Sequence, residues 1–283
     1  MEVVKTIKQV RTLVAEAKKA GKKVALVPTM GNLHDGHLTL IDEAKKAANF
    51  IVCSVFVNPT QFGPGEDLDK YPRTALQDQQ KLTFKSVAIF FSPPEYEMYP
   101  FGRMQTTVEV PHITKTLCGA ARPGHFTGVT TVVSKLFNIV QPDFAVFGEK
   151  DFQQLVVIKK MVRELFYPIE ILSIPTVREA DGLAMSSRNA FLNEADRTLA
   201  PQLYATLSSV KYKMLAGERD FNKLAADAKQ RLEDKGFTTD YFEIRDAETL
   251  ERCSESTSRL VLLGAVTLGQ TRLIDNISLT LKS

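Results

Sequence analysis

Short apolar runs alternate with stretches of helical periodicity through the first part of the chain, up to Pro175. An apolar run bounded by breakers predicts a buried strand, and apolar positions three and four apart predict a helix. By this pattern we expect strands at 24–27, 50–57, 87–91, 106–110, 144–147 and 169–174, and helices at 3–20, 38–48, 74–85, 129–140 and 152–166. Because strands and helices alternate, the pattern predicts an α/β fold with a parallel, right-handed, doubly wound sheet.

The pattern changes after Pro175, where a polar and irregular stretch at 177–189 begins. Beyond it we expect helices at 194–215 and 222–235 and strands at 241–244, 260–266 and 271–281. Helices followed by adjacent strands indicate a smaller α+β domain with an antiparallel sheet. We therefore predict two domains, at 1–176 and 177–283.

The stretch from Val24 to His37 carries the main chemical signal. Its apolar run ends at Pro28, and a His-x-Gly-His quartet at 34–37 opens the amphipathic helix that follows. In open α/β sheets ligands bind at the carboxyl ends of strands, and a helix N-terminus favours anions. Two imidazoles one turn apart, beside glycines that admit a ligand to the backbone, suit a phosphate chain.

Two other interpretations of this histidine pair remain open. His34 and His37 are equally typical of one helix cap and one surface residue when they are seen alone. A metal site would need a third ligand, for which His112, His125 and the acids are candidates, but no zinc spacing is complete. The position between a buried strand and a helix favours the phosphate site.

Composition narrows the class of protein. The 44% hydrophobic and 24% charged fractions of the 283 residues are ordinary for a globular chain. The net charge is +3, and the basic residues are scattered, so no nucleic-acid partner is expected. The three cysteines lie far apart, Cys53 within an apolar run, which fits a reducing compartment without a disulfide framework. No signal segment or bilayer-length apolar run is present, so we expect a soluble, cytoplasmic protein without a membrane partner.

The motifs together resemble one family. Pro28–His37 (PTMGNLHDGH) is similar to the His-x-Gly-His signature of nucleotidylyl transferases and class I aminoacyl-tRNA synthetases. In order along the chain follow Phe56–Phe62 (FVNPTQF), Tyr71–Thr74 (YPRT), Arg122–Phe126 (RPGHF), Phe147–Gln154 (FGEKDFQQ) and Asp181–Asn189 (DGLAMSSRN). Any one motif is weak, but the ordered series resembles the pantothenate synthetase (pantoate–β-alanine ligase) family over nearly the whole chain.

That resemblance implies a Rossmann-like catalytic domain, a C-terminal lid domain, a homodimer, and ATP with Mg²⁺. The implied chemistry has two steps, in which pantoate attacks the α-phosphate of ATP and the β-alanine amine then attacks the pantoyl adenylate. A carboxylic acid with a pKa of roughly 4 is already ionised near neutral pH, so the first step needs no general base. It needs in-line placement and charge neutralisation.

The resemblance also assigns the residues that meet ATP. We predict that His37 donates a proton to the phosphate, with His34 as its partner and Lys150 as a cation. Arg188 follows two serines in a loop that looks like the Lys-Met-Ser-Lys-Ser loop of related synthetases, although a solvated hydroxyl-rich loop is the simpler alternative. The predicted ATP contacts are Met30, Gly31, Asn32, Leu33, His34, Asp35, Gly36, His37, Gly148, Glu149, Lys150, Asp151, Val177, Met185, Ser186, Ser187 and Arg188.

The segment Gly148–Asp151 admits two interpretations of its own. It is typical of a polar turn with an aspartate helix cap. Its place at the carboxyl end of an apolar strand favours a nucleotide contact, in which the glycine admits ATP, Asp151 meets ribose and Lys150 meets phosphate. Val177 is expected to touch adenine through its backbone.

Substrate and metal contacts follow from the resemblance alone. It places Gln61 and Gln154 on pantoate, whereas the residues by themselves favour a solvated loop glutamine for Gln61 and allow an exposed helix residue for Gln154. Asp78 is expected to help hold Mg²⁺, against the ordinary alternative of a solvated helix acid, and residues 75–77 (Ala-Leu-Gln) replace acids found in some relatives. Arg122 and His125 meet either the nucleotide or a subunit interface.

Two rival functions remain at this stage. A nucleotidylyl transferase would join AMP to a phosphorylated precursor with much of the same machinery. A non-catalytic nucleotide- or RNA-binding protein would fit the slightly basic charge, but the chain has no basic stripe interleaved with aromatic residues. We expect the ligase, with small molecules as its partners.

Overall fold

The computed structural model describes residues 1–102, 105–254 and 257–281. The chain forms two compact units. The first unit contains Met1–Gly148 and Val157–Pro175, and the second unit contains Glu149–Val156 and Thr176–Ser283. Among the described residues, no helix combines the length and the apolar character needed to cross a membrane.

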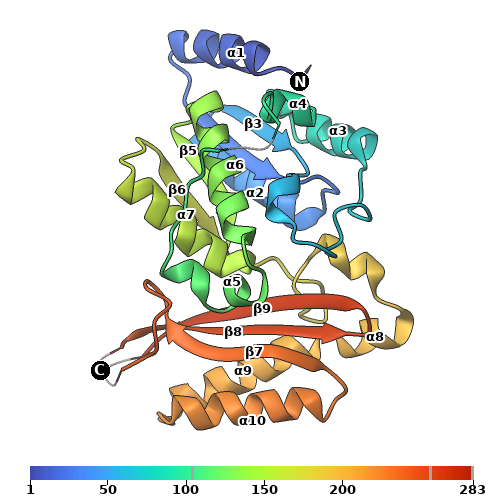
Figure 1. The fold of residues 1–283 in the computed structure, drawn as a ribbon, viewed down its shortest axis with the longest axis vertical. Helices are drawn as coiled ribbons and strands as arrows, with labels where there is room; N and C mark the ends of the chain where they lie inside the picture. The colour runs from blue at the N-terminus through green and yellow to red at the C-terminus, as the bar shows by residue number, and fades with distance from the viewer. Residues whose placement is uncertain (103–104, 255–256, 282–283) are drawn as a thin grey trace. The chain divides into compact units, whose positions relative to one another are not determined.

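A six-stranded parallel sheet forms the centre of the first unit, with the strand order β1-β4-β3-β2-β5-β6. Figure 1 labels three of its strands, β3, β5 and β6. Its strands are β1 (Glu2–Val4), β2 (Val24–Thr29), β3 (Phe50–Val55), β4 (Ile89–Phe91), β5 (Phe144–Gly148) and β6 (Glu170–Ile174). The helices of this part of the chain are α1 (Ile7–Lys19), α2 (Asp35–Ala47), α3 (Ala75–Phe84), α4 (Glu95–Met98), α5 (Cys118–Ala121), α6 (His125–Val140) and α7 (Phe152–Glu164). The predicted doubly wound, Rossmann-like sheet is confirmed.

Apolar residues of these strands and of α2 form the core of the sheet. Val27, Ile41, Val146 and Cys53 are all fully buried there. Burial raises the pKa of the Cys53 thiol to about 12, so this cysteine is a protonated core residue.

The helix predicted from Val3 and the strand predicted at 106–110 differ from the structure. The helix predicted from Val3 begins only at Ile7, because residues 2–4 pair with β4 and Thr6 caps the helix by accepting from the Gln9 N–H. Residues 106–110 form no strand. Their backbone is bound instead by side chains of α6, since the Val108 N–H donates to Thr131 and its carbonyl accepts from Thr130.

Strand β2 also continues past the proline at which we expected it to end. Pro28 and Thr29 remain in register with β3, opposite Ser54 and Val55. On its other side β2 pairs with β5 only at Ala25 and Leu26, so Pro28 lies beyond that ladder. A proline lacks an N–H donor and is tolerated where one side of a strand is unpaired.

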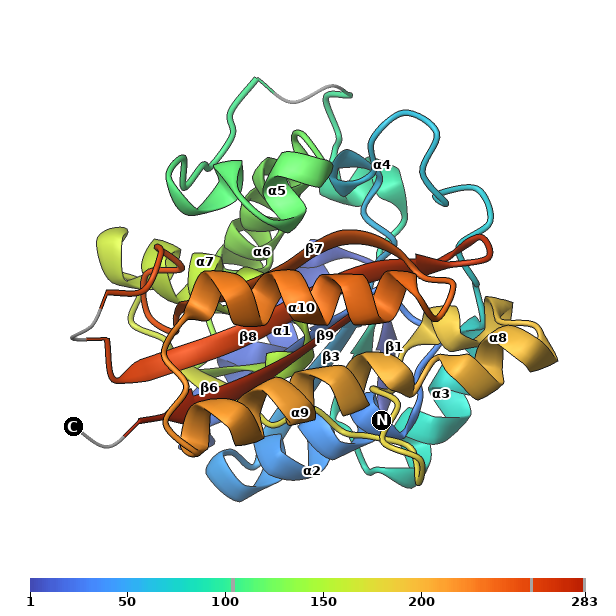
Figure 2. The same ribbon diagram turned by 90° about the horizontal axis from the view of Figure 1, so that it is seen from below.

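The second unit has the predicted α+β architecture. It contains α8 (Glu194–Leu199), α9 (Gln202–Leu215) and α10 (Phe221–Glu233), and an antiparallel sheet of β7 (Thr238–Asp246), β8 (Arg259–Leu268) and β9 (Thr271–Thr280). Figure 2 shows α9 and α10 side by side over this sheet, in agreement with their packing on its strands. The single helix expected at 194–215 is two helices, because Pro201 at the junction lacks the N–H that a continuous helix would use.

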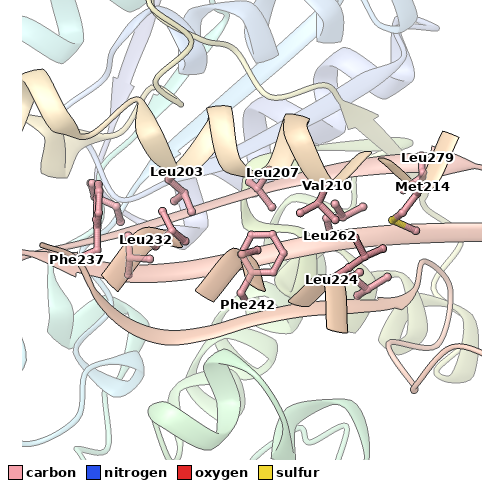
Figure 3. Packing of buried hydrophobic residues seen from close by; sticks show 14 of the residues in the cluster. Leu203, Leu207, Val210, Met214, Leu224, Leu232, Phe237, Phe242, Leu262 and Leu279 are labelled. Atoms are coloured by element: carbon pink, nitrogen blue, oxygen red, sulfur yellow. The ribbon is translucent and has the colours of Figure 1, made fainter. Parts of the chain in front are cut away.

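The apolar face of α9 fills the core of the second unit. Leu203, Leu207, Val210 and Met214 recur three and four positions apart and are all buried. Figure 3 shows them gathered with side chains of α10 and of the sheet. Each buried side chain of this size contributes about 1.5–3 kcal/mol of hydrophobic stabilisation. This packing gives the three-stranded sheet a hydrophobic core of its own.

Candidate active site

The strand order reverses between β2 and β5, which are neighbours in the sheet. The chain runs from β2 toward β3 in one direction and from β5 toward β6 in the other, and ligands of open α/β sheets bind at such a switch point. The loop of Met30–Leu33 follows β2 directly, and Gly148 is the last residue of β5. The predicted phosphate site therefore begins at the carboxyl edge where that rule expects a ligand.

His34 and His37 lie together at the start of α2. Their ring centroids are 4.1 Å apart, and His34 is the N-cap residue of the helix. The His34 backbone N–H donates to Nδ1 of His37 at 3.3 Å, and the His37 N–H donates to the His34 carbonyl at 2.8 Å. Because Nδ1 of His37 is an acceptor, the proton of its neutral ring lies on Nε2. The backbone thus selects the tautomer that makes Nε2 a hydrogen-bond donor.

The other residues of this motif form the loop and the first helical turn. Gly31 and Asn32 have φ values of +87° and +51°, which turns the chain sharply away from the sheet. The Gly31 N–H donates to the Thr29 hydroxyl, which in turn donates to the Ser54 carbonyl of β3. Leu33 is buried in the core, whereas Asp35 and Gly36 lie in the first turn of α2, Asp35 exposed and Gly36 half-buried.

Asp78 lies on α3 and contacts this loop. One carboxylate oxygen accepts from the Leu33 N–H at 2.8 Å, and the other accepts from the Asn32 N–H at 2.9 Å and from Thr74 Oγ1 at 3.1 Å. The residue is only 1% exposed. Magnesium keeps several of its waters when it binds protein carboxylates, so it requires an oxygen open to solvent. Asp78 does not fit this requirement.

Gln61, at the end of the short 3-10 turn after β3, is buried with a fixed amide. Its Oε1 accepts from Asn58 Nδ2 at 3.1 Å, so the amide nitrogen is turned the other way, where it lies 3.2 Å from the sulfur of Met30. The predicted glutamine therefore lies beside the loop that carries the histidines. A thioether is a weak acceptor, so a stronger anionic partner can replace it at little cost.

The residues that fix Gln61 were not all predicted. Asn58 is 1% exposed, and its Oδ1 accepts from the Tyr99 hydroxyl at 2.5 Å and from Thr60 Oγ1 at 3.0 Å. Burial raises the pKa of Tyr99, which keeps its hydroxyl a donor. Asn58 stands in a recognised motif, but Tyr99 lies far along the chain in a stretch without any motif.

Arg122 and His125 contact the loop of Gln61. The guanidinium of Arg122 donates two hydrogen bonds to Glu66, at 2.9 and 2.5 Å, and lies 3.0 Å from Nε2 of His125. Nδ1 of His125 lies 2.7 Å from the Gln61 carbonyl. The hydrogen bonds from Arg122 hold the pKa of Glu66 below its ordinary value. These side chains fix the loop between Asn58 and Glu66.

In the second unit, the turn of Glu149–Asp151 is held by the sheet. Asn276 of β9 is 5% exposed, and its side-chain amide donates to the carbonyl oxygens of Glu149 and Lys150 at 2.8 and 2.9 Å. The Lys150 ammonium lies 3.9 Å from Asp151, whose side chain is half exposed. No sequence signal pointed to Asn276, because its partners lie more than a hundred positions away.

The neighbouring Asp275 forms a buried ion pair. Its carboxylate accepts from both terminal nitrogens of Arg178, at 2.6 and 2.9 Å, and the guanidinium stacks on the ring of Tyr204 at 3.6 Å. Burial raises the pKa of Asp275, and the hydrogen bonds from Arg178 oppose that shift. The pair ties the start of the 177–189 segment to β9.

That polar segment is ordered by its own hydrogen bonds. The Met185 N–H donates to the Val177 carbonyl at 3.0 Å, so these two predicted residues are adjacent. Ser186 caps a 3-10 turn that contains Ser187 and Arg188, by accepting from the Arg188 N–H at 3.3 Å. The hydroxyl-rich loop thus has a defined backbone.

Gln154 lies in the first turn of α7 and is half-buried. Its neighbour Gln153 is only 5% exposed and belongs to the same helical turn. The two consecutive amides therefore differ in environment, and Gln154 is the more accessible of them.

The full sequence matches one known family. The sequence model described as pantoate-beta-alanine ligase matches residues 2–278. A pantothenate synthetase of Pseudomonas savastanoi pv. phaseolicola is 54% identical over 281 residues, which cover 99% of both chains. A pantothenate synthetase of Pseudomonas fluorescens strain Pf0-1 is 55% identical over 282 residues, again 99% of each chain.

Solved structures agree with that match. The crystal structure of pantothenate synthetase from Thermus thermophilus has a TM-score of 0.92 at 42% identity, and the likeness covers 98% of this chain and 99% of that one. Pantoate-beta-alanine ligase from Francisella tularensis, in complex with beta-gamma ATP and beta-alanine, has a TM-score of 0.79 at 34% identity, with 98% and 97% covered.

Proposed function

This chain belongs to the pantoate–β-alanine ligase family, and we propose on that premise that it joins pantoate to β-alanine through a pantoyl adenylate, at the expense of ATP. The match of the family over residues 2–278 is the observation that carries the proposal. The relative from Francisella tularensis, which was crystallised with beta-gamma ATP and beta-alanine, supports ATP and β-alanine as substrates. The overall change is pantoate, β-alanine and ATP to pantothenate, AMP and pyrophosphate.

In the first step a pantoate carboxylate oxygen bonds to the α-phosphorus of ATP while the bond to the pyrophosphate oxygen breaks. The carboxylate is ionised at neutral pH, so the residues have to place it and to stabilise the charge that moves onto the phosphates. We assign the Nε2–H of His37 as the donor to phosphate, because Nδ1 of that ring is already engaged by the His34 N–H. Lys150 and Arg188 supply positive charge.

Pantoate binds beside the Met30–Leu33 loop in this proposal. The Gln61 amide nitrogen, now against the Met30 sulfur, turns to the pantoate carboxylate or hydroxyl, and the Asn58 hydrogen bond keeps its direction. Gln154 contributes a second neutral amide. Neutral donors leave the carboxylate nucleophilic, because a tight cation pair would lower its reactivity.

In the second step the β-alanine amine bonds to the acyl carbon, loses a proton and expels AMP. Water competes for the same carbon, so the adenylate has to be shielded from solvent until the amine arrives. We propose that Val177 and residues 185–188 belong to the ATP-binding surface of the 177–283 domain. The motif at 181–189 supports that assignment, and internal hydrogen bonds give its backbone a defined conformation.

Three further expectations remain proposals: Mg²⁺ with ATP and a homodimer, which rest on the family resemblance, and a cytoplasmic location, which rests on the composition of the chain. Magnesium on the phosphates would offset their negative charge. The Asp78 carboxylate is not assigned to the ion, since its buried oxygens bind the Asn32–Leu33 backbone.

Exchange of labelled pyrophosphate into ATP tests the function. We expect exchange that requires pantoate but not β-alanine, and release of AMP together with pantothenate once β-alanine is added. Exchange that instead required a phosphomonoester would establish a nucleotidylyl transferase. Absence of AMP under every substrate combination would leave only a binding protein.

A further inference from the structure

We propose that Asp78 is a positioning residue that fixes the His34–His37 pair through the loop before it, and that it is not a ligand of magnesium. With Thr74 and Lys81 it forms what we call the α3 clamp, a set of side chains that hold the backbone of Asn32 and Leu33. The catalytic meaning of the clamp rests on the proposed function. Its structural part rests on the hydrogen bonds that Asp78, Thr74 and Lys81 make.

The hydrogen-bond capacity of Asp78 is largely used within the protein. The oxygen that binds the Asn32 N–H also accepts from Thr74, and the second oxygen binds the Leu33 N–H. A carboxylate oxygen offers about two lone-pair sites, so the first oxygen is saturated. At 1% exposure the residue has no solvent-facing side on which a hydrated ion can rest.

The backbone of the loop is shaped for this carboxylate. Gly31 and Asn32 both have positive φ, a conformation that costs free energy for a residue with a side chain. It brings two successive N–H groups onto one carboxylate, an arrangement by which backbone turns bind anions. Here the bound anion is Asp78. The N–H groups of Asn32 and Leu33 are therefore not available to ATP, which leaves the side chains of His34 and His37 as the donors that this motif offers to phosphate in the proposed function.

A second contact holds the next peptide, between Leu33 and His34. The Lys81 ammonium, one helical turn after Asp78, donates to the Leu33 carbonyl. The space is also closed, since a Cβ on Gly31 would lie 3.2 Å from an Asp78 oxygen and 3.0 Å from a Val55 methyl. Both polar groups of Leu33 are thus bound by α3.

A single peptide bond joins the residue held by the clamp to the histidine pair. Leu33 directly precedes His34, and the His34 N–H sets the tautomer of His37 by donating to its Nδ1. A shift of the Leu33 backbone moves that N–H. We therefore expect loss of the clamp to alter both the position and the tautomer of His37.

The test compares Asp78→Asn with Asp42→Asn, which removes a half-exposed carboxylate that binds Lys85 away from the loop. We expect Asp78→Asn to lower kcat at saturating Mg²⁺ by about 10²-fold, the order of loss for a misplacement of roughly 1 Å. The half-saturating Mg²⁺ concentration stays within about twofold, because a residue that does not bind the ion leaves its affinity unchanged. In ¹⁵N-histidine spectra the ring signals of His37 change in Asp78→Asn and remain in Asp42→Asn.

One result overturns the proposal directly. If Asp78→Asn needs far more Mg²⁺ but recovers wild-type kcat once saturated, Asp78 is a metal ligand. If that variant does not fold, Thr74→Val and Lys81→Met carry the test, because each removes one part of the clamp and keeps the carboxylate. Wild-type kcat and unchanged His37 signals in both would also overturn it.

The experiment distinguishes failure of the clamp proposal from failure of the proposed function. If the wild-type enzyme shows no pantoate-dependent exchange, the ligase proposal fails, while the His37 spectra still report on the clamp. If exchange occurs and the spectra do not respond to Asp78→Asn, the clamp alone fails.

Discussion

Asn276 donates a hydrogen bond to the carbonyl oxygen of Lys150 at 2.9 Å across 126 positions of the sequence. The same amide nitrogen donates to Glu149 at 2.8 Å, so one buried side chain fixes two successive peptides of the turn. The backbone of the predicted catalytic lysine is therefore set by a strand of the C-terminal sheet. Under the proposed function, this sheet therefore positions a catalytic residue in addition to its role in the fold.

Asn276→Asp should lower kcat by about 10- to 100-fold and the free energy of unfolding by about 1–3 kcal/mol, because it replaces the two donors by an acceptor facing two carbonyls. Steady-state kinetics and urea unfolding measure the two effects. Ser278→Ala, at an exposed position of the same strand, is the matched control and should change neither. Wild-type kcat in Asn276→Asp would mean that the turn does not position Lys150 for catalysis.

His37→Ala should lower kcat by about 10²–10³-fold, the usual loss when one donor to a developing negative charge is removed. The tautomer of His37 also predicts which substitution keeps more activity. Since the donor is Nε2, His37→Gln, whose amide nitrogen reaches a similar place, should retain more activity than His37→Asn. His112→Ala, an exposed histidine outside the loop, should be unaffected. Equal activity of the Gln and Asn variants would contradict the assigned tautomer.

The sequence predicted the parts of the site that lie close together along the chain. The His-x-Gly-His quartet and the strand before it give a local signal, because a buried strand, a tight turn and a helix start each have their own residue preferences. The partners that fix these residues have no such signal. Tyr99, Asn276 and the clamp of Asp78 are defined by hydrogen bonds between distant segments, which leave no periodicity in the sequence.

The errors in the fold have a similar origin. The short β1 strand is recognisable only through its pairing with β4, since three residues carry too little pattern to be told from a helix start. Residues 106–110 look like a strand, yet their backbone groups bind Thr130 and Thr131. Tertiary hydrogen bonds override local preference in both cases.

Glu66→Gln should weaken the loop of Gln61 in a pH-dependent way. The pKa of Glu66 in the folded protein lies below its ordinary value of 4.5, chiefly because Arg122 hydrogen-bonds the carboxylate. Its stabilising contribution is therefore complete above pH 4.5 and is lost as the pH falls through the lower, folded-state pKa. The Tm difference between wild type and Glu66→Gln should be largest near neutral pH and should shrink below pH 4.5.

The control for this pH series is Glu43→Gln, which removes a similar charge paired with Lys46 on an exposed face. Exposed pairs contribute about 0–1 kcal/mol, so its Tm should differ little from wild type. A Tm difference for Glu66→Gln that grows toward acid would reverse the sign expected here.

Tyr99→Phe should raise the KM for pantoate by about three- to tenfold, the effect of a hydrogen bond worth about 0.5–1.5 kcal/mol. The hydroxyl holds Asn58, and Asn58 holds the Gln61 amide, so its loss lets that amide rotate. The KM for ATP should stay near wild type. Tyr96→Phe, at a tyrosine 73% exposed on α4, is the control. An equal rise in both KM values would place Tyr99 outside the pantoate site.

Gly128→Ala should disrupt the same loop through α6. A Cβ on Gly128 would lie 2.3 Å from the Thr60 carbonyl oxygen and 2.6 Å from Cα of Gln61, so α6 or the loop has to move. Such overpacking costs about 1–3 kcal/mol, and a shift of about 1 Å at Gln61 should cut kcat/KM for pantoate by about 10²-fold. Gly63→Ala is the matched control in the loop itself, because its Cβ would meet nothing closer than 3.6 Å. Urea unfolding separates the loss of stability from the loss of pantoate recognition. If Gly128→Ala were less stable but kept wild-type kcat/KM for pantoate, the close approach of α6 would serve folding and not the substrate.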